Sequence, residues 1–245
     1  MLFWMSFVYA LAFTIIHICT KYLFFVKHGE RNYFLSVSGG IAVSYVFIHL
    51  LPELNSHQRI IEDSNTFEGL KFLENHAFIM ALCGLVIFYG LERMVKNAKK
   101  GDKESKKGIS YTGVFWIHIS FFFVYNALIG YLLIREHYEN GSGMFFYFLA
   151  LAVHFMTNDH SLRSEHKQVY DKYGRWLLSG AILIGWILGV VTKVDELIIS
   201  LLVAFLAGGI TLNVLKEELP EEKDSSFVAF SIGILGYTSL LLLVN

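Results

Sequence analysis

The sequence predicts an all-α, polytopic membrane protein with eight transmembrane helices, and three observations lead to this fold class. Of the 245 residues, 55% are hydrophobic and 17% are charged, whereas a soluble domain carries more charge. Apolar runs of roughly 20 residues, the length that crosses a bilayer, recur along the whole chain. Only two residues are proline, so little interrupts these helices. We therefore expect a single membrane domain over residues 1–245, in contact with the lipid bilayer.

The eight expected spans are separated by short polar loops. The segment beginning at Leu2 lacks a basic n-region and a small-residue cleavage site, which favours a first membrane helix over a cleaved signal peptide. A polar loop with Glu62, Asp63 and Glu68 follows the second span, and residues 96–110 form a lysine-rich cytoplasmic linker after the third. The expected spans cover residues 2–26, 33–54, 76–95, 112–134, 144–163, 174–192, 194–215 and 227–244.

The distribution of Lys and Arg predicts the orientation. Of the 20 Lys and Arg residues, 16 lie in or beside loops one, three, five and seven, and the other four are Arg59, Lys71, Arg135 and Lys193. Since cytoplasmic loops are enriched in positive residues, the odd loops should be cytoplasmic and both termini outside. We expect an integral protein of the cell (plasma or inner) membrane.

Charge and cysteine usage argue against several classes of protein. The formal net charge is −1, so nothing suggests a nucleic-acid partner. Cys19 and Cys83 both lie in apolar runs without zinc-knuckle spacing, which favours buried, reduced thiols. We expect no enzyme activity. An intramembrane metal hydrolase using His154, Asp159 and His160 would need several ligands, and the chain has no second His-rich span.

The most informative stretch is Leu149–Leu162, which begins apolar and then places several polar residues within two helical turns. His154 and Asn158 are four residues apart and share one helix face, which Thr157 and Ser161 flank. Because one charged side chain at the bilayer centre costs about 2.5–3.5 kcal/mol, we expect these groups to face the bundle interior. The default hypothesis for such a cluster is a solute or ion pathway.

Two segments of the chain resemble each other. Residues 40–53 read GIAVSYVFIHLLPE, residues 208–221 read GGITLNVLKEELPE, and glycine and proline are twelve positions apart in both. The glycines allow close helix approach, and each proline should break or kink its helix near the membrane edge. The segments lie in spans two and seven, which cross in opposite directions. This layout predicts an inverted repeat, common in secondary transporters, with chance similarity as the alternative.

At these residues the chain resembles the ZIP (Zrt/Irt-like) metal transporters. Residues 39–54, GGIAVSYVFIHLLPEL, are similar to the family's second span, and residues 205–221 are similar to its seventh. FYGLERM at the end of span three resembles the family's apolar run closing on a glutamate, here Glu92. The resemblance covers nearly the whole chain. It implies an eight-helix bundle, a metal centre between spans four and five, and a possible homodimer.

The span-four pattern of the family is His-Asn, two residues, an acid and Gly. It matches residues 125–130 of this chain, where Asn126 and Gly130 are kept but Tyr125 replaces the histidine and Ile129 replaces the acid. The chain therefore departs from the family at two of the four positions.

The span-five pattern is His-Glu, two residues, and a second His-Glu. It matches residues 154–159, where His154 is kept, Phe155 replaces the first acid, Asn158 the second histidine and Asp159 the second glutamate. One imidazole, one carboxylate and two amides make a two-metal centre unlikely, because divalent ions need three or four good ligands.

The resemblance and the polar cluster together imply a weak single metal site formed by His154, Asn126 and Asn158. Asp159 or a histidine from elsewhere would complete it, and His118 is the best candidate because it lies seven residues before Tyr125 on roughly the same face. Tyr125 itself is a poor zinc ligand at neutral pH. The alternative is that His154 and the two asparagines are hydrogen-bonded between helices as structural contacts.

Three more residues could line a pathway. His49 and Glu53 would form either a headgroup-level cap at the proline kink or an outer access point for cations, and Glu217 would line an exit or belong to a solvated face. The expected function is passage of a divalent ion, such as zinc, manganese or iron, as substrate, with no permanently bound cofactor. The alternative is a ZIP-like protein that no longer transports and acts as a scaffold or regulator.

Overall fold

The computed structural model describes residues 1–23, 28–63, 75–101, 111–135, 141–218 and 226–244, and every element within them is helical. Three short π-helical turns, η1, η3 and η4, continue neighbouring α-helices. The elements are α1 (Leu2–Leu23), α2 (His28–Tyr45), η1 (Val46–Leu50), α3 (Leu51–Asp63), α4 (His76–Gly101), α5 (Tyr111–Arg135), α6 (Gly141–Val169), η3 (Tyr170–Gly174), α7 (Arg175–Val191), α8 (Glu196–Asn213), η4 (Val214–Glu218) and α9 (Phe227–Val244).

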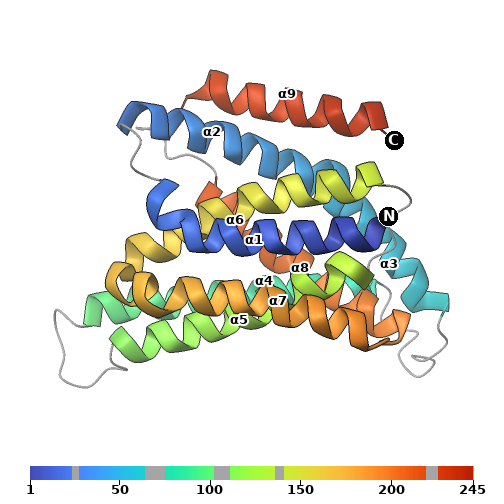
Figure 1. The fold of residues 1–245 in the computed structure, drawn as a ribbon, viewed down its shortest axis with the longest axis horizontal. Helices are drawn as coiled ribbons and strands as arrows, with labels where there is room; N and C mark the ends of the chain where they lie inside the picture. The colour runs from blue at the N-terminus through green and yellow to red at the C-terminus, as the bar shows by residue number, and fades with distance from the viewer. Residues whose placement is uncertain (24–27, 64–74, 102–110, 136–140, 219–225, 245) are drawn as a thin grey trace.

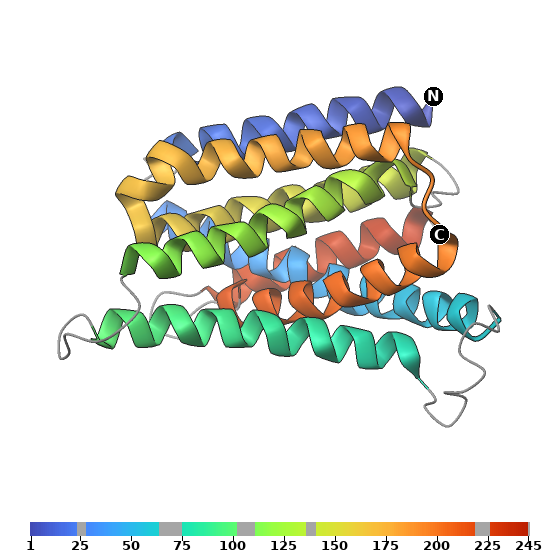
Figure 2. The ribbon, with the colours of Figure 1, turned by 90° about the horizontal axis from the view of Figure 1, so that it is seen from below.

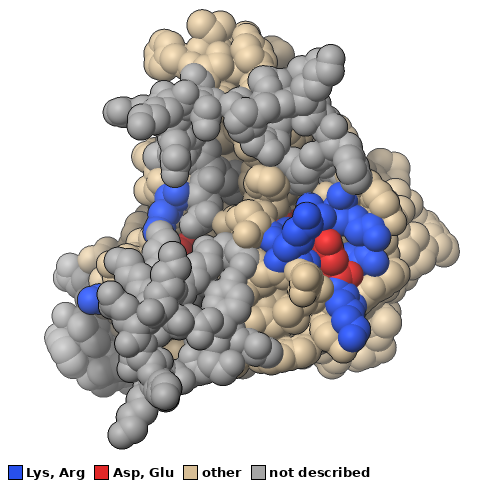
Figure 3. All heavy atoms as spheres, turned by 90° about the vertical axis from the view of Figure 1, so that its left-hand side faces the viewer, with Lys and Arg blue, Asp and Glu red and all other residues tan. Residues whose placement is uncertain are grey.

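The helices lie side by side with their axes roughly aligned, and their direction reverses from one membrane-length segment to the next along the chain (Figures 1 and 2). The helices α1, α4, α6 and α8 run one way, and α2 with α3, α5, α7 and α9 run the other way. Both ends of the described chain consequently lie at the same end of the bundle (Figure 1). At the opposite end, Lys and Arg side chains gather around acidic ones (Figure 3).

Three pairs of glycines bring parallel helices into backbone contact. A Cβ on Gly40 of α2 would lie 2.2 Å from the Phe230 carbonyl oxygen of α9, and one on Gly233 would lie 2.3 Å from that of Val37. The same reciprocal pattern joins Gly84 of α4 to Gly208 of α8, and Gly130 of α5 to Gly185 of α7. Only glycine permits so close an approach, which gives each pair a large van der Waals contact.

The α2–α9 and α4–α8 crossings are copies of one another. When α2 is aligned with α8 through Gly40 and Gly208, Val37 aligns with Phe205. When α9 is aligned with α4 through Gly233 and Gly84, Phe230 aligns with Ala81. The carbonyl oxygens of these four aligned residues are the ones that lie against the four glycines of the partner helices. Since α2 and α8 run in opposite directions (Figure 2), the duplicated contacts have the arrangement of an inverted repeat.

The π turns repeat in the same register. Aligned through Gly40 and Gly208, η1 falls on η4, and each turn ends two residues before a proline. In the first copy the Leu51 N–H bonds to the Val46 carbonyl, five residues back, which widens the turn ahead of Pro52. Of the two expectations for Pro52, a break or a kink, the break is wrong for the first copy: after the π turn the chain resumes as α3 and continues to Asp63.

Several expected boundaries need correction. Glu62 and Asp63 belong to α3 and not to a loop, and the first part of the 96–110 linker, to residue 101, belongs to α4. The fifth expected span is longer than predicted, since α6 runs from Gly141 to Val169 with non-helical dihedral angles at His166. The second expected span begins five residues too late, since α2 starts at His28 and not at residue 33. The other boundaries agree within three residues wherever the structure describes them, because long apolar runs define them well.

Six helices of the described chain are long and apolar enough to cross a membrane, and they come from α1, α2–α3, α4, α5, η3–α7 and α8. The apolar helix α9 is shorter, and α6, which carries the polar cluster, is not among the six. The structure is thus compatible with a multi-pass membrane protein. That all eight segments cross the membrane is part of the proposed function.

Candidate functional site in the bundle interior

The cluster predicted on residues 154–159 is shielded by neighbouring helices. His154, Thr157, Asn158 and Asp159 are 2%, 6%, 6% and 0% exposed. The expectation that these groups face the interior is therefore confirmed. Three helices, α1, α5 and α6, supply the partners described next.

His154 contacts Tyr125, the residue at which the ZIP resemblance would place a histidine. Its Nε2 atom lies 2.9 Å from the hydroxyl oxygen of Tyr125, which joins α6 to α5 inside the protein. Phe88 of α4 packs edge-on to Tyr125, with ring centroids 5.4 Å apart. The hydrogen bond uses the imidazole nitrogen that would otherwise be available to a metal ion, so a cation would have to displace the phenol.

The two asparagines are buried but incompletely bonded. Asn126 donates to the Phe122 carbonyl of its own helix at 2.7 Å, and its Oδ1 has no hydrogen bond within the described residues. The same is true of Nδ2 of Asn158. Buried polar atoms without partners are costly, which makes these two amides candidates for binding water or a solute. Their expected role as ligands stays a prediction.

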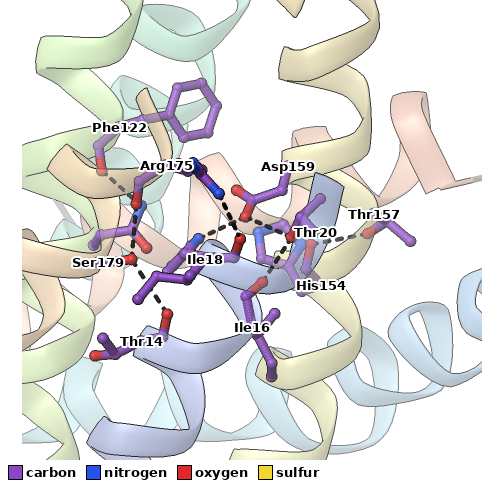
Figure 4. A network of polar contacts seen from close by, with 12 residues as sticks. Thr14, Ile16, Ile18, Thr20, Phe122, His154, Thr157, Asp159, Arg175 and Ser179 are labelled. Atoms are coloured by element: carbon purple, nitrogen blue, oxygen red, sulfur yellow. Dashed lines mark hydrogen bonds and ion pairs between the residues drawn. The ribbon is translucent and has the colours of Figure 1, made fainter. Parts of the chain in front are cut away.

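Asp159 is directed to a different helix from His154. Its Oδ2 lies 2.7 Å from Nδ1 of His17 and accepts a hydrogen bond from Thr20 at 3.1 Å, and both of these residues are on α1. Figure 4 shows Asp159 facing α1. Five residues turn a helix by about 140°, which is why the two side chains diverge.

Further polar contacts join α1 to α7. The Ser179 hydroxyl lies 2.7 Å from the Arg175 carbonyl and 3.2 Å from that of Thr14, and Arg175 donates to the Ile18 carbonyl at 3.3 Å (Figure 4). These contacts fasten α1 to α7. Asp159 itself is bonded to α1, and no described contact joins its carboxylate to His154.

Two cavities that share Glu53 lie in the bundle, and neither is lined by Tyr125 or His154. The outer one, of about 630 Å³, is lined by residues that include Glu53, His57, Arg135 and Glu196. The inner one, of about 20 Å³, also touches Glu53 and reaches Ile129, one helical turn from Tyr125. Its volume suits a single water molecule. Glu53 therefore lines both cavities.

The remaining predicted pathway residues are placed as follows. His49 lies in η1, with Nε2 3.6 Å from Oε2 of Glu53. His118 is buried on α5 and packs edge-on against Phe122, with centroids 4.9 Å apart. The side chain of Glu217 lies outside the described residues. Glu92, the acid that resembles the family's span-three glutamate, forms an ion pair with Lys216 of η4.

Three polar residues of the buried interior were not indicated by the sequence. His17, which no sequence motif marks as a site residue, is fully buried against Asp159, 142 residues away. Tyr45 and Asn213 occupy equivalent positions before the two π turns, and both are buried with a polar atom that lacks a partner among the described residues. The alignment of residues 40–53 with 208–221 pairs these two positions and could have revealed them.

Within the described residues, no group of three or more His, Cys, Asp or Glu side chains is placed to hold a metal ion. The fold and site together define a helical bundle with membrane-length apolar helices and a buried polar interior. No protein-family model, no curated protein and no solved structure matches the chain. The function must therefore be argued from its own residues.

Proposed function

We propose that this chain is an eight-span membrane protein of ZIP type that passes a divalent metal cation, such as zinc, through the interior near His154. The observation that carries the proposal is the duplication: two oppositely directed helices each carry a close glycine crossing, a π turn and a Pro-Glu pair. Inverted repeats with interrupted helices are the common design of secondary transporters.

The polar interior supplies what such a pathway needs. An intramembrane histidine is by default a functional group, and the two helices that carry Tyr125 and His154 also carry two buried amides with atoms that lack partners among the described residues. The two cavities that share Glu53 support the proposal, in which they form the start of the route from one end of the bundle. In this proposal, the cation displaces the Tyr125 phenol, binds at His154 and the asparagines, and leaves when the two halves rock against each other.

Zinc uptake by proteoliposomes tests this proposal. Vesicles containing the protein should accumulate more zinc than protein-free vesicles, and the difference should saturate with zinc concentration. Equal uptake by the two preparations would end the transport proposal.

A second candidate, a ZIP-like protein that no longer transports and has a scaffold or regulatory role, is favoured by a specific observation. His154 is hydrogen-bonded to Tyr125 and Asp159 is paired with His17, so two of the proposed ligands are already engaged. Zinc added to the purified protein separates the candidates. A working site raises the melting temperature by mass action, whereas the scaffold predicts no zinc-dependent shift.

A further inference from the structure

Several cationic side chains surround Asp171. Figure 3 shows Lys and Arg gathered around acidic side chains at the end of the bundle opposite the termini. Arg163 donates to both carboxylate oxygens of Asp171, at 2.7 and 3.1 Å, and Arg175 donates to its backbone carbonyl at 2.9 Å. Lys21 of α1 acts electrostatically on the same carboxylate. Lys21, Arg163, Arg175 and the adjacent Lys172 are here called the cationic cluster. Since Asp171 balances one charge, the cluster keeps an excess of positive charge.

Three members of the cluster lie over aromatic rings. Lys21 lies 4.6 Å from the ring centroid of Tyr22, Lys172 lies 5.0 Å from that of Tyr173, and Arg175 lies 4.8 Å from that of Trp176. These rings are 57%, 43% and 52% exposed. Exposed Tyr and Trp next to Lys and Arg are typical of the headgroup level of a membrane. The pairs place the charges at the boundary between headgroups and acyl chains.

An apolar face of α7 leads away from the cluster. Trp176, Ile184 and Ile187 are exposed along this face, and Gly180 lies between Trp176 and Ile184 at helical spacing. A Cβ built on Gly180 meets no atom within 4 Å, so the space beside this glycine is open. We call this space, where the exposed Trp176 and Ile184 have no side chain between them, the recess; an acyl chain can lie there against the helix.

We propose that the cationic cluster and this face of α7 form a binding site for a phospholipid with an anionic headgroup. The phosphate lies among Lys21, Lys172 and Arg175, and an acyl chain runs over Gly180. Charge-assisted hydrogen bonds and the negative surface of anionic membranes favour such a headgroup over a zwitterionic one. The alternative is that these Lys and Arg residues only set the membrane topology. That role would require neither the ion pair between Arg163 and Asp171 nor the recess at Gly180. The proposal requires a membrane location but not transport.

The headgroup part is tested by melting the purified, delipidated protein in detergent with added phosphatidylglycerol or phosphatidylcholine. Phosphatidylglycerol should raise the melting temperature more than phosphatidylcholine does. The double variant Lys21→Gln/Lys172→Gln should lose this difference. The matched control Arg59→Gln/Lys193→Gln removes the same charge from exposed positions at the other end of the bundle and should keep it. Loss in both double variants, or in neither, overturns the proposal.

A second comparison separates a lipid from a free phosphate. Inorganic phosphate and glycerol phosphate should not reproduce the shift, and Gly180→Leu should weaken the phosphatidylglycerol effect because it fills the recess. Gly236→Leu on α9 is the control, since a Cβ there also meets no atom within 4 Å. A full shift with inorganic phosphate, or an unchanged lipid effect in Gly180→Leu, contradicts a lipid site. Melting without lipid confirms that both variants fold.

Discussion

Tyr125 and His154 face each other across the bundle interior, with 2.9 Å between the phenol oxygen and Nε2 of the imidazole. These are the two positions at which the ZIP resemblance places metal-binding histidines. One is kept and the other is a tyrosine that bonds to it. The contact explains why the site can persist in an apolar bundle without a bound ion, because a buried imidazole with a partner costs less than one without.

Removing the Tyr125 hydroxyl tests how much its hydrogen bond with His154 contributes to stability. Tyr125→Phe should lower the free energy of unfolding by about 1–3 kcal/mol, because it deprives a buried imidazole of a partner. Thermal unfolding in detergent measures the change, and Tyr89→Phe, at a half-exposed position on α4, is the control. Equal stability of Tyr125→Phe and the wild type would show that the hydrogen bond is not formed.

Restoring a histidine tests whether the interior can hold a metal. Tyr125→His would place a second imidazole beside His154, and histidine is a preferred zinc ligand. Zinc should raise the melting temperature of this variant more than that of the wild type. In Tyr89→His, where the new imidazole lies on an exposed face, the zinc-dependent shift should stay at the wild-type value. No additional shift in Tyr125→His would mean that the α5–α6 geometry does not suit a cation.

The His17–Asp159 pair should be strongly coupled, because both side chains are fully buried. Removing either partner alone leaves a buried polar group or charge uncompensated, at a cost of about 3–5 kcal/mol. We expect His17→Leu and Asp159→Leu each to destabilise the protein strongly, and the double variant to cost much less than the sum of the two. Additive losses in this double-mutant cycle would contradict a direct interaction.

Alanine should destabilise the protein at the glycines where two helices touch, but not at a glycine with open space around it. Gly40→Ala and Gly208→Ala should each destabilise by at least about 1–3 kcal/mol, because the new methyl group meets a backbone carbonyl oxygen 2.2 or 1.7 Å away. Gly90→Ala, with open space around its Cβ, should be neutral or stabilise by up to about 1 kcal/mol through helix propensity. Similar melting temperatures for all three variants would refute the close approach of α2 to α9 and of α4 to α8.

Much of the fold could be predicted from apolar periodicity, and the exceptions have physical reasons. The ends of α5, α7 and α9 were predicted within one residue because each apolar run stops at polar residues. The continuation past Pro52 was missed because a π turn rearranges the hydrogen bonds that a proline would otherwise break. No local sequence pattern indicates where such a turn compensates for a proline.

The sequence predicted only those features of the site that depend on a single helix. Burial of His154, Asn158 and Asp159 follows from the cost of polar groups in lipid, and the divergence of Asp159 follows from helical geometry. Their partners could not be predicted, since Tyr125 and His17 lie far away in sequence and meet α6 only after the bundle packs. Long-range packing therefore determines which polar groups become a site.

The most direct test of the central claim is zinc uptake by proteoliposomes carrying His154→Ala, at equal protein density, compared with wild type and with His76→Ala. His76→Ala removes a half-buried imidazole at the start of α4, outside the proposed pathway. Passage of the cation at His154 predicts saturable wild-type uptake that His154→Ala reduces at least about tenfold, equivalent to about 1.4 kcal/mol, while His76→Ala retains it. Uptake by His154→Ala at the wild-type rate would contradict the account.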